Sequence, residues 1–118
     1  MSAPVPFPVS FLGDSPAFRI HLARAADSAV VAPEGDLDVA TVDELRTKVV
    51  ALAAGGCRSV VLDLSRLAFA DSSEIHLLLE LEAAAAIDGF AFAVRLGDAT
   101  PARRLLDVAG LAERFASV

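Results

Sequence analysis

SVVLDLSRLAFADSSEI, residues 59–75, joins an apolar run to a cluster of hydroxyl and acidic side chains. Residues 59–64 are almost continuously apolar, which is typical of a central strand covered on both faces. Residues 65–70 are expected to form a connecting loop, and the polar cluster at 71–74 then begins a helix that extends to about residue 88. The stretch therefore predicts a buried strand and a helix, with polar side chains where the helix begins.

Two shorter strands are predicted before this unit. Apolar and polar side chains alternate over residues 18–22, as expected for a half-buried strand. Residues 29–32 predict a second strand, and a turn at residues 27–28 would join the two as a hairpin. Residues 35–38 are then expected to form a loop.

A helix is predicted from Thr41, because Thr41 and Glu44 have the spacing of a capping box. Its apolar residues recur at helical spacing and are Val42, Leu45, Val49 and Leu52. The helix is expected to end at Gly55-Gly56, because glycine commonly terminates helices.

The last third of the chain alternates again. Residues 90–96 predict a strand, and Pro101 suits the first turn of a helix that ends at Gly110. Residues 114–118 are expected to form a short last strand. The predicted order is strand, strand, helix, strand, helix, strand, helix and strand, which indicates a partly parallel sheet.

One α/β domain is therefore expected over residues 18–118, in keeping with a chain of 118 residues. Its sheet should contain four or five strands of mixed direction, with helices at 41–54, 72–88 and 100–109 packed on one face. Residues 1–17 hold four of the six prolines, which oppose helix formation, and are expected to form a tail or an added edge strand.

Composition and charge exclude several classes of protein. The net charge is −6 and no basic cluster exceeds Arg103-Arg104, which argues against nucleic-acid binding. No apolar stretch reaches the roughly 18 residues that a membrane span requires, and no basic segment precedes an apolar one at the start. We therefore expect a cytoplasmic protein that does not insert into membranes. The single cysteine, Cys57, is expected to be a packing or turn residue.

Catalytic and cofactor motifs are not found in the sequence. It contains no G-x-S-x-G motif, no Gly-rich phosphate loop, and no histidine spaced to share a metal with His21 or His76. A phosphate-accepting receiver domain would have a lysine after a late strand, whereas the only lysine, Lys48, lies in the first predicted helix. We expect neither an enzyme nor a bound metal or cofactor.

The cluster at residues 71–74 has two interpretations. Asp71, with Glu74 three residues later, can cap the helix, as can Ser72. Capping does not explain both serines, however, and a hydroxyl at a helix N-terminus lies where the backbone favours an anion. A phosphate at this point would be tolerated by the fold and would present new charge to a partner, so the site suits a switch.

The predicted helix over residues 72–88 is apolar on more than one side. Its two stripes are Ile75, Leu79 and Ala86 on one side, and Leu77, Leu81 and Ala84 on another. One stripe must cover the sheet, and flanking helices can cover part of the second. Whatever stays uncovered would be a surface for a partner or for self-association.

Three stretches together resemble a known family. They are GDLDVATVDELR at 35–46, SVVLDLSRLAFADSSEI at 59–75 and PARRLLDVAGLAERF at 101–115. From Phe18 to Phe115 the chain resembles a STAS domain, the family of bacterial anti-sigma factor antagonists and sulphate-transporter tails. The middle stretch is fairly specific to that family, and the other two occur in the expected order.

The resemblance implies a bacterial protein of transcription control that binds an anti-sigma factor. In phosphorylatable members the second hydroxyl of the serine pair accepts phosphate from a partner serine kinase, which breaks the complex. That position is Ser73 here, with Ser72 as the alternate. The residues expected to bind the partner are Asp38, Asp71, Ser72, Ser73, Glu74 and Leu77, and a homodimer remains open. Asp38 has the alternative role of forming the turn before the first helix.

The sequence departs from the family at Glu74, where a glycine is usual. Glutamate adds bulk and is expected to place a negative charge beside Ser73, which would impair phosphorylation or imitate it. This departure supports an alternative function, a STAS scaffold or transport module that is not switched by phosphate. Such a module would be the small partner of a lipid-transport ATPase or a ligand-binding STAS domain.

Overall fold

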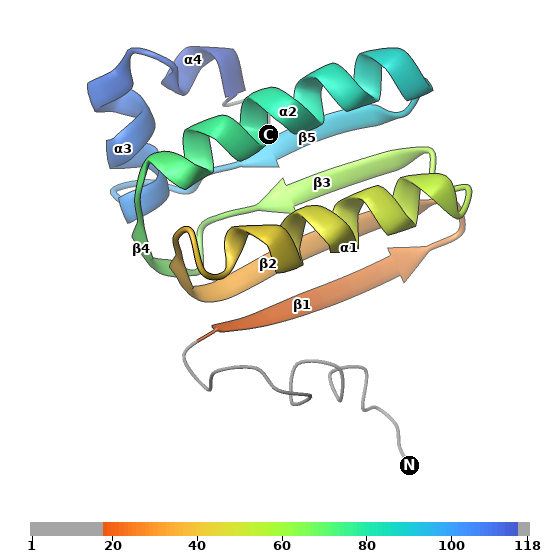
Figure 1. Ribbon diagram of the computed structural model, residues 1–118, viewed down its shortest axis with the longest axis horizontal. Helices are drawn as coiled ribbons and strands as arrows, with labels where there is room; N and C mark the ends of the chain where they lie inside the picture. Colours follow the sequence, from red (N-terminus) through yellow and green to blue (C-terminus); the bar gives the residue numbers. More distant parts are fainter. Residues whose placement is uncertain (1–17, 116–118) are drawn as a thin grey trace.

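The structure, a computed structural model, describes residues 18–115 (Figure 1). Its strands are β1 (Phe18–Ala25), β2 (Ser28–Leu37), β3 (Ser59–Asp63), β4 (Leu67–Ala70) and β5 (Ala91–Arg95). Its helices are α1 (Val42–Ala54), α2 (Ser72–Asp88), α3 (Pro101–Ala109) and α4 (Ala112–Phe115). The predicted tail or edge strand at residues 1–17 lies outside the described residues.

The strands form one mixed sheet in the order β1-β2-β3-β5, as the predicted fold class requires. β1 and β2 form an antiparallel hairpin, whereas β2, β3 and β5 are parallel to one another. β4 pairs in parallel with the last residues of β2, beyond the part of β2 that pairs with β3. The predicted α/β domain with a sheet of four or five strands is confirmed.

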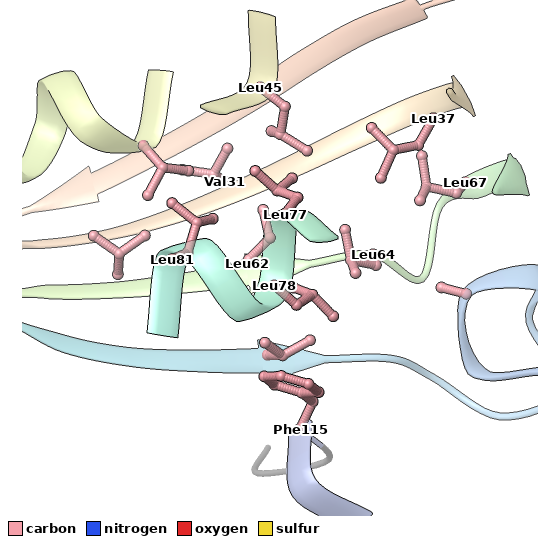
Figure 2. Packing of buried hydrophobic residues seen from close by; sticks show 14 of the residues in the cluster. Val31, Leu37, Leu45, Leu62, Leu64, Leu67, Leu77, Leu78, Leu81 and Phe115 are labelled. Carbon is pink, nitrogen blue, oxygen red and sulfur yellow. The ribbon is translucent and has the colours of Figure 1, made fainter. Parts of the chain in front are cut away.

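The hydrophobic core lies between the sheet and the helices. α1 and α2 contact each other and lie across one face of the sheet, while α3 packs on β4 and α4 on β5 (Figure 1). Leu45 of α1, Leu62 of β3 and Leu77 of α2 belong to one buried cluster (Figure 2). All four apolar residues predicted to face the core from α1 are buried: Val42, Leu45, Val49 and Leu52. Helical periodicity therefore predicted this interface correctly.

Burial along β3 alternates instead of being continuous. Val60 and Leu62 are fully buried on the helix side, whereas Val61 is only partly buried. The predicted central position of this strand is confirmed, since it lies between β2 and β5. The prediction that this strand is covered on both faces is wrong at Val61, which is only partly buried.

Two segments predicted as loops are strands. Residues 35–37 continue β2, and residues 67–70 form β4, because the two segments pair with each other through Asp36 with Phe69 and Leu37 with Ala70. The register of the β2–β4 pairing shifts between Gly35 and Asp36, both of which pair with β4, so this ladder contains a local irregularity. This pairing joins residues about thirty positions apart, so local patterns do not reveal it.

Some helix and turn predictions also need correction. The hairpin turn lies at residues 26–27 rather than 27–28, with Ala26 at a φ of 54°. Residues 112–115 form the short helix α4, so the strand predicted from residue 114 is wrong within the described part of the chain. α2 and α3 end as predicted, at Gly89 and Gly110 in the left-handed conformation.

Candidate functional site

The first turn of α2 carries the predicted hydroxyl site. Asp71 is the N-cap residue, and its Oδ1 accepts a hydrogen bond of 2.9 Å from the backbone N–H of Ser73. Ser72 is exposed and Ser73 is partly exposed, so both lie at the surface. The capping role predicted for Asp71 is confirmed. Because Asp71 caps the helix, neither serine side chain is needed as the cap.

A backbone hydrogen bond brings a second predicted residue to this place. The N–H of Asp71 donates to the carbonyl of Leu37 at 3.2 Å, which ties the start of α2 to the end of β2. Asp38 follows Leu37 directly and is partly exposed. The loop that contains Asp38 and the turn that contains Ser73 therefore meet at the same end of the sheet, on the left in Figure 1.

Asp38 organises its own turn. Its Oδ1 accepts from the N–H of Ala40 at 2.9 Å and from Oγ1 of Thr41 at 3.3 Å, and its N–H donates to the same Oγ1 at 3.1 Å. Thr41 Oγ1 also donates to the carbonyl of Asp36 at 2.8 Å. Because the Thr41 hydroxyl is used in the loop, it makes no capping bond to α1, and the capping box predicted there is wrong.

Glu74 does not lie on the surface. Its side chain is fully buried, and neither carboxyl oxygen has a hydrogen-bond partner. A capping box would have turned it back to the N–H of Asp71, but that N–H is already bonded to Leu37. Burial raises the pKa of Glu74 to about 8. At neutral pH the carboxyl group of Glu74 is therefore mostly uncharged. The prediction that Glu74 places a negative charge beside Ser73 is wrong.

The buried face of α2 explains where Glu74 points. The residues that face the core are Glu74, Leu77, Leu78, Leu81 and Ala85, at the spacing of one helical stripe. Of the two predicted stripes, the one with Leu77 and Leu81 lies on this core face, with Ala84 partly buried. In the other stripe, Ala86 is exposed and Ile75 and Leu79 are only partly buried. Glu74 and Leu77 therefore cannot touch a partner in this conformation. The same spacing, read back from Leu77 and Leu78, would have placed residue 74 in the core.

Exposed apolar side chains of the loop after β2, of β4 and of α3 were not predicted. Val39, Phe69 and Val108 are 80%, 49% and 89% exposed, and they belong to the loop after β2, to β4 and to α3. A shallow hollow of about 390 Å³ lies between β4 and α3 and is lined by Ala68, Phe69, Ala70, Pro101, Arg104, Leu105 and Val108. Apolar patches of this kind are typical of protein-binding surfaces. The signal in the sequence was Phe69 itself, beside the polar cluster.

A family model described as "Mlab, STAS domain" matches residues 20–116, nearly the whole chain. The chain belongs to the STAS family. The resemblance recognised from the three sequence stretches is therefore confirmed. No curated protein matches this STAS domain in sequence.

Solved structures show the same fold. An anti-sigma factor antagonist from Mycobacterium paratuberculosis is 26% identical, with a TM-score of 0.65 over 86% of each chain. SpoIIAA in its unphosphorylated form, also named an anti-sigma factor antagonist, is 22% identical, with a TM-score of 0.67 over 80% of this chain and 83% of SpoIIAA. The phosphorylated form of the Bacillus SpoIIAA is 20% identical, with a TM-score of 0.62 over 81% and 86%.

The described part of the STAS domain has neither a metal-binding cluster nor a membrane-spanning helix. Between residues 18 and 115, no group of three or more His, Cys, Asp or Glu residues is arranged to hold a metal ion. Within the same range, no helix has the length and apolar character to cross a bilayer. Cys57 is buried, and its thiol lies 3.3 Å from the carbonyl of Asp27 as a weak donor, which fits the predicted packing role. His76 is exposed on α2.

Proposed function

We propose that this STAS domain is a cytoplasmic, non-enzymatic antagonist of an anti-sigma factor, and that phosphorylation of Ser73 switches it off. The unphosphorylated surface binds the anti-sigma factor and so releases a sigma factor for transcription. The family supports this proposal, as do solved relatives that are named anti-sigma factor antagonists.

The observation that carries the proposal is the surface position of Ser73 in the first turn of α2, next to the Asp38 turn. A phosphate there adds a charge of about −1.5 to −2. It would lie close to the Asp71 carboxylate, which holds the N–H of Ser73. Phosphorylation would therefore change both the charge and the cap of the turn, and a partner that fits the free hydroxyl would lose its fit.

The partner surface is proposed to include the apolar side chains around this turn. Val39 directly follows Asp38, Phe69 precedes Asp71 by two residues, and Val108 lines the same hollow as Phe69. Exposed apolar side chains that gather in this way are typical of protein-binding surfaces. Glu74 and Leu77 support this surface from the core and are not part of it.

We expect an anti-sigma kinase that binds the chain to phosphorylate Ser73 when ATP is present. The test uses wild type, Ser73→Ala and Ser72→Ala, each incubated with the same kinase, followed by mass spectrometry of the modified peptide. Wild type and Ser72→Ala should be modified at residue 73, and Ser73→Ala should not. Modification at Ser72 alone, or none by a kinase shown to bind, would reject the assignment.

Asp38→Asn should weaken partner binding about fivefold while leaving the free energy of unfolding within about 0.5 kcal/mol of wild type. Asparagine keeps an oxygen that accepts from the N–H of Ala40, so the turn survives and only the charge is lost. Asp38→Ala is the matched control, because it also loses the turn bonds and should cost about 1 kcal/mol of stability. Calorimetric titration with the partner and urea unfolding provide the two measurements. Equal affinity of Asp38→Asn and wild type would show that Asp38 only builds the turn.

A second candidate function is favoured by one observation, the buried Glu74 in place of the glycine usual in the family. This second function is that of a STAS scaffold or transport module, either the small partner of a lipid-transport ATPase or a ligand-binding domain. Such a module would need no phosphate switch. Affinity purification from the source organism distinguishes the two proposals. Recovery of an anti-sigma factor supports the first, and recovery of a transport ATPase subunit supports the second.

A further inference from the structure

The most unusual buried group in the domain is the carboxyl group of Glu74. It occupies the third position of α2, one residue after Ser73, and both oxygens lack a hydrogen-bond partner. A buried polar group without partners destabilises the conformation that contains it. The first turn of α2, which carries the proposed partner surface, therefore packs over a group whose burial reduces the stability of the fold.

The charges on the packed elements do not hold Glu74 in place. α2 packs against α1, β5 and α3. The charged residues of α1 are Asp43, Glu44, Arg46 and Lys48; that of β5 is Arg95; and those of α3 are Arg103, Arg104 and Asp107. The arginines bond elsewhere: Arg46 to Glu80, Arg95 to Asp63, and Arg103 and Arg104 to backbone carbonyls. None of these charges shifts the pKa of Glu74, which burial alone raises to about 8. An ionised Glu74 would thus have no counter-charge in the core.

We infer that Glu74 is a proton-operated switch of the partner surface: the neutral side chain stays in the core and supports the first turn of α2, and the ionised side chain leaves the core and rearranges that turn. This inference rests on the proposed function, because the rearranged turn contains Asp71, Ser72 and Ser73. An ionised carboxylate that leaves the core emerges beside Ser73. It then places negative charge where the proposed phosphate would lie.

The mechanism follows from the cost of burying a charge. An unpaired carboxylate in an apolar core is far less stable than the neutral acid, so proton loss and exit of the side chain occur together. The exit cannot leave the turn unchanged, since Glu74 lies on the buried face of α2 with Leu77 and Leu78, and its side chain reaches solvent only when the first turn rotates or unwinds. Partner binding should therefore weaken as the pH rises through the pKa of Glu74.

The test follows the whole chain by NMR from about pH 6 to about pH 9.5, with Glu74→Gln as the matched control that cannot ionise. In wild type, the Glu74 carboxyl carbon and the amides of Ser72 and Ser73 should shift together with a midpoint near 8. The chemical shifts of the same amides should not change with pH in Glu74→Gln, or in Glu74→Met if the glutamine variant does not fold. A His76→Asn background removes the nearby imidazole, so that the remaining amide shifts report on Glu74.

Affinity for the anti-sigma factor is then measured across the same pH range. Wild type should bind about tenfold more weakly at the alkaline end, and Glu74→Gln should change less than about twofold. A midpoint in the ordinary glutamate range, or amide shifts that persist in Glu74→Gln, would overturn the switch. A titrating Glu74 with pH-independent affinity would overturn its link to binding. Absence of any binding at every pH would reject the proposed function, while the NMR midpoint still decides whether the turn responds to the proton.

Discussion

Leu77→Ala is expected to destabilise the domain by about 3 kcal/mol, within the range of about 2–5 kcal/mol seen for buried leucines. Leu77 is completely buried in α2, in the same cluster as Leu45 and Leu62 (Figure 2). Alanine would remove apolar contacts and leave a cavity that the packed helices can only partly close. For a domain of this size the melting temperature should fall by more than about 10 °C.

The matched control is Ile87→Ala, on the same helix. Ile87 is 83% exposed, so its truncation should change the unfolding free energy by less than about 0.5 kcal/mol. Far-UV circular dichroism in urea gives both values, since the chain contains no Trp or Tyr to serve as a fluorescence probe. A small loss at Leu77, equal to that at Ile87, would contradict the packing described for α2.

Glu74→Met is expected to stabilise the domain by about 2 kcal/mol at neutral pH. Methionine has a similar length and flexibility, fills the same space and has no oxygen that needs a hydrogen bond. The cost of burying two unpartnered oxygens is therefore removed without opening a cavity. Glu74→Gln is the control, because its amide remains polar and unpartnered and should gain less.

Glu74→Met should also remove a pH dependence of the free energy of unfolding. Burial raises the pKa of Glu74 from 4.5 to about 8, so the folded chain binds more protons than the unfolded chain between these values. Stability therefore falls as the pH rises through this window, by about 1.4 kcal/mol per pH unit, and the loss ends once both states are ionised. Urea unfolding at several pH values should show this slope in wild type and lose it in Glu74→Met. An identical slope in both proteins would assign it to other groups.

The elements that sequence reasoning predicted are those with a local pattern. The alternation at Phe18 and the helical spacing from Val42 to Leu52 each reflect one face of one element against the core. β4 has only four residues, two of which are exposed, and exists because it pairs with the end of β2. α4 is equally short. Such segments take their structure from distant partners, so a local pattern cannot identify them.

The candidate site was predictable to a similar extent. Asp71 as the cap and the serines beside it follow from rules for helix ends. Glu74 had the right spacing for the core, but the general rule that glutamate is exposed led to the opposite prediction. The meeting of Asp38 with this turn depends on the hydrogen bond from Asp71 to Leu37, which links segments that are far apart in sequence.

On the side away from β1, β2 divides its length between two partners, β3 along its first residues and β4 along its last. Asp36 and Leu37 lie beyond the pairing with β1 and pair only with the four-residue β4, and the Asp71–Leu37 hydrogen bond continues that ladder into α2. These segments should therefore open and close as one cooperative unit, distinct from the rest of the sheet in hydrogen exchange. A partner that binds the Asp38 loop would then slow amide exchange at Asp71 as well, through the hydrogen bonds that the two segments share. Amide exchange at the ends of β2 and β4 and at the start of α2 would therefore slow together when a partner binds.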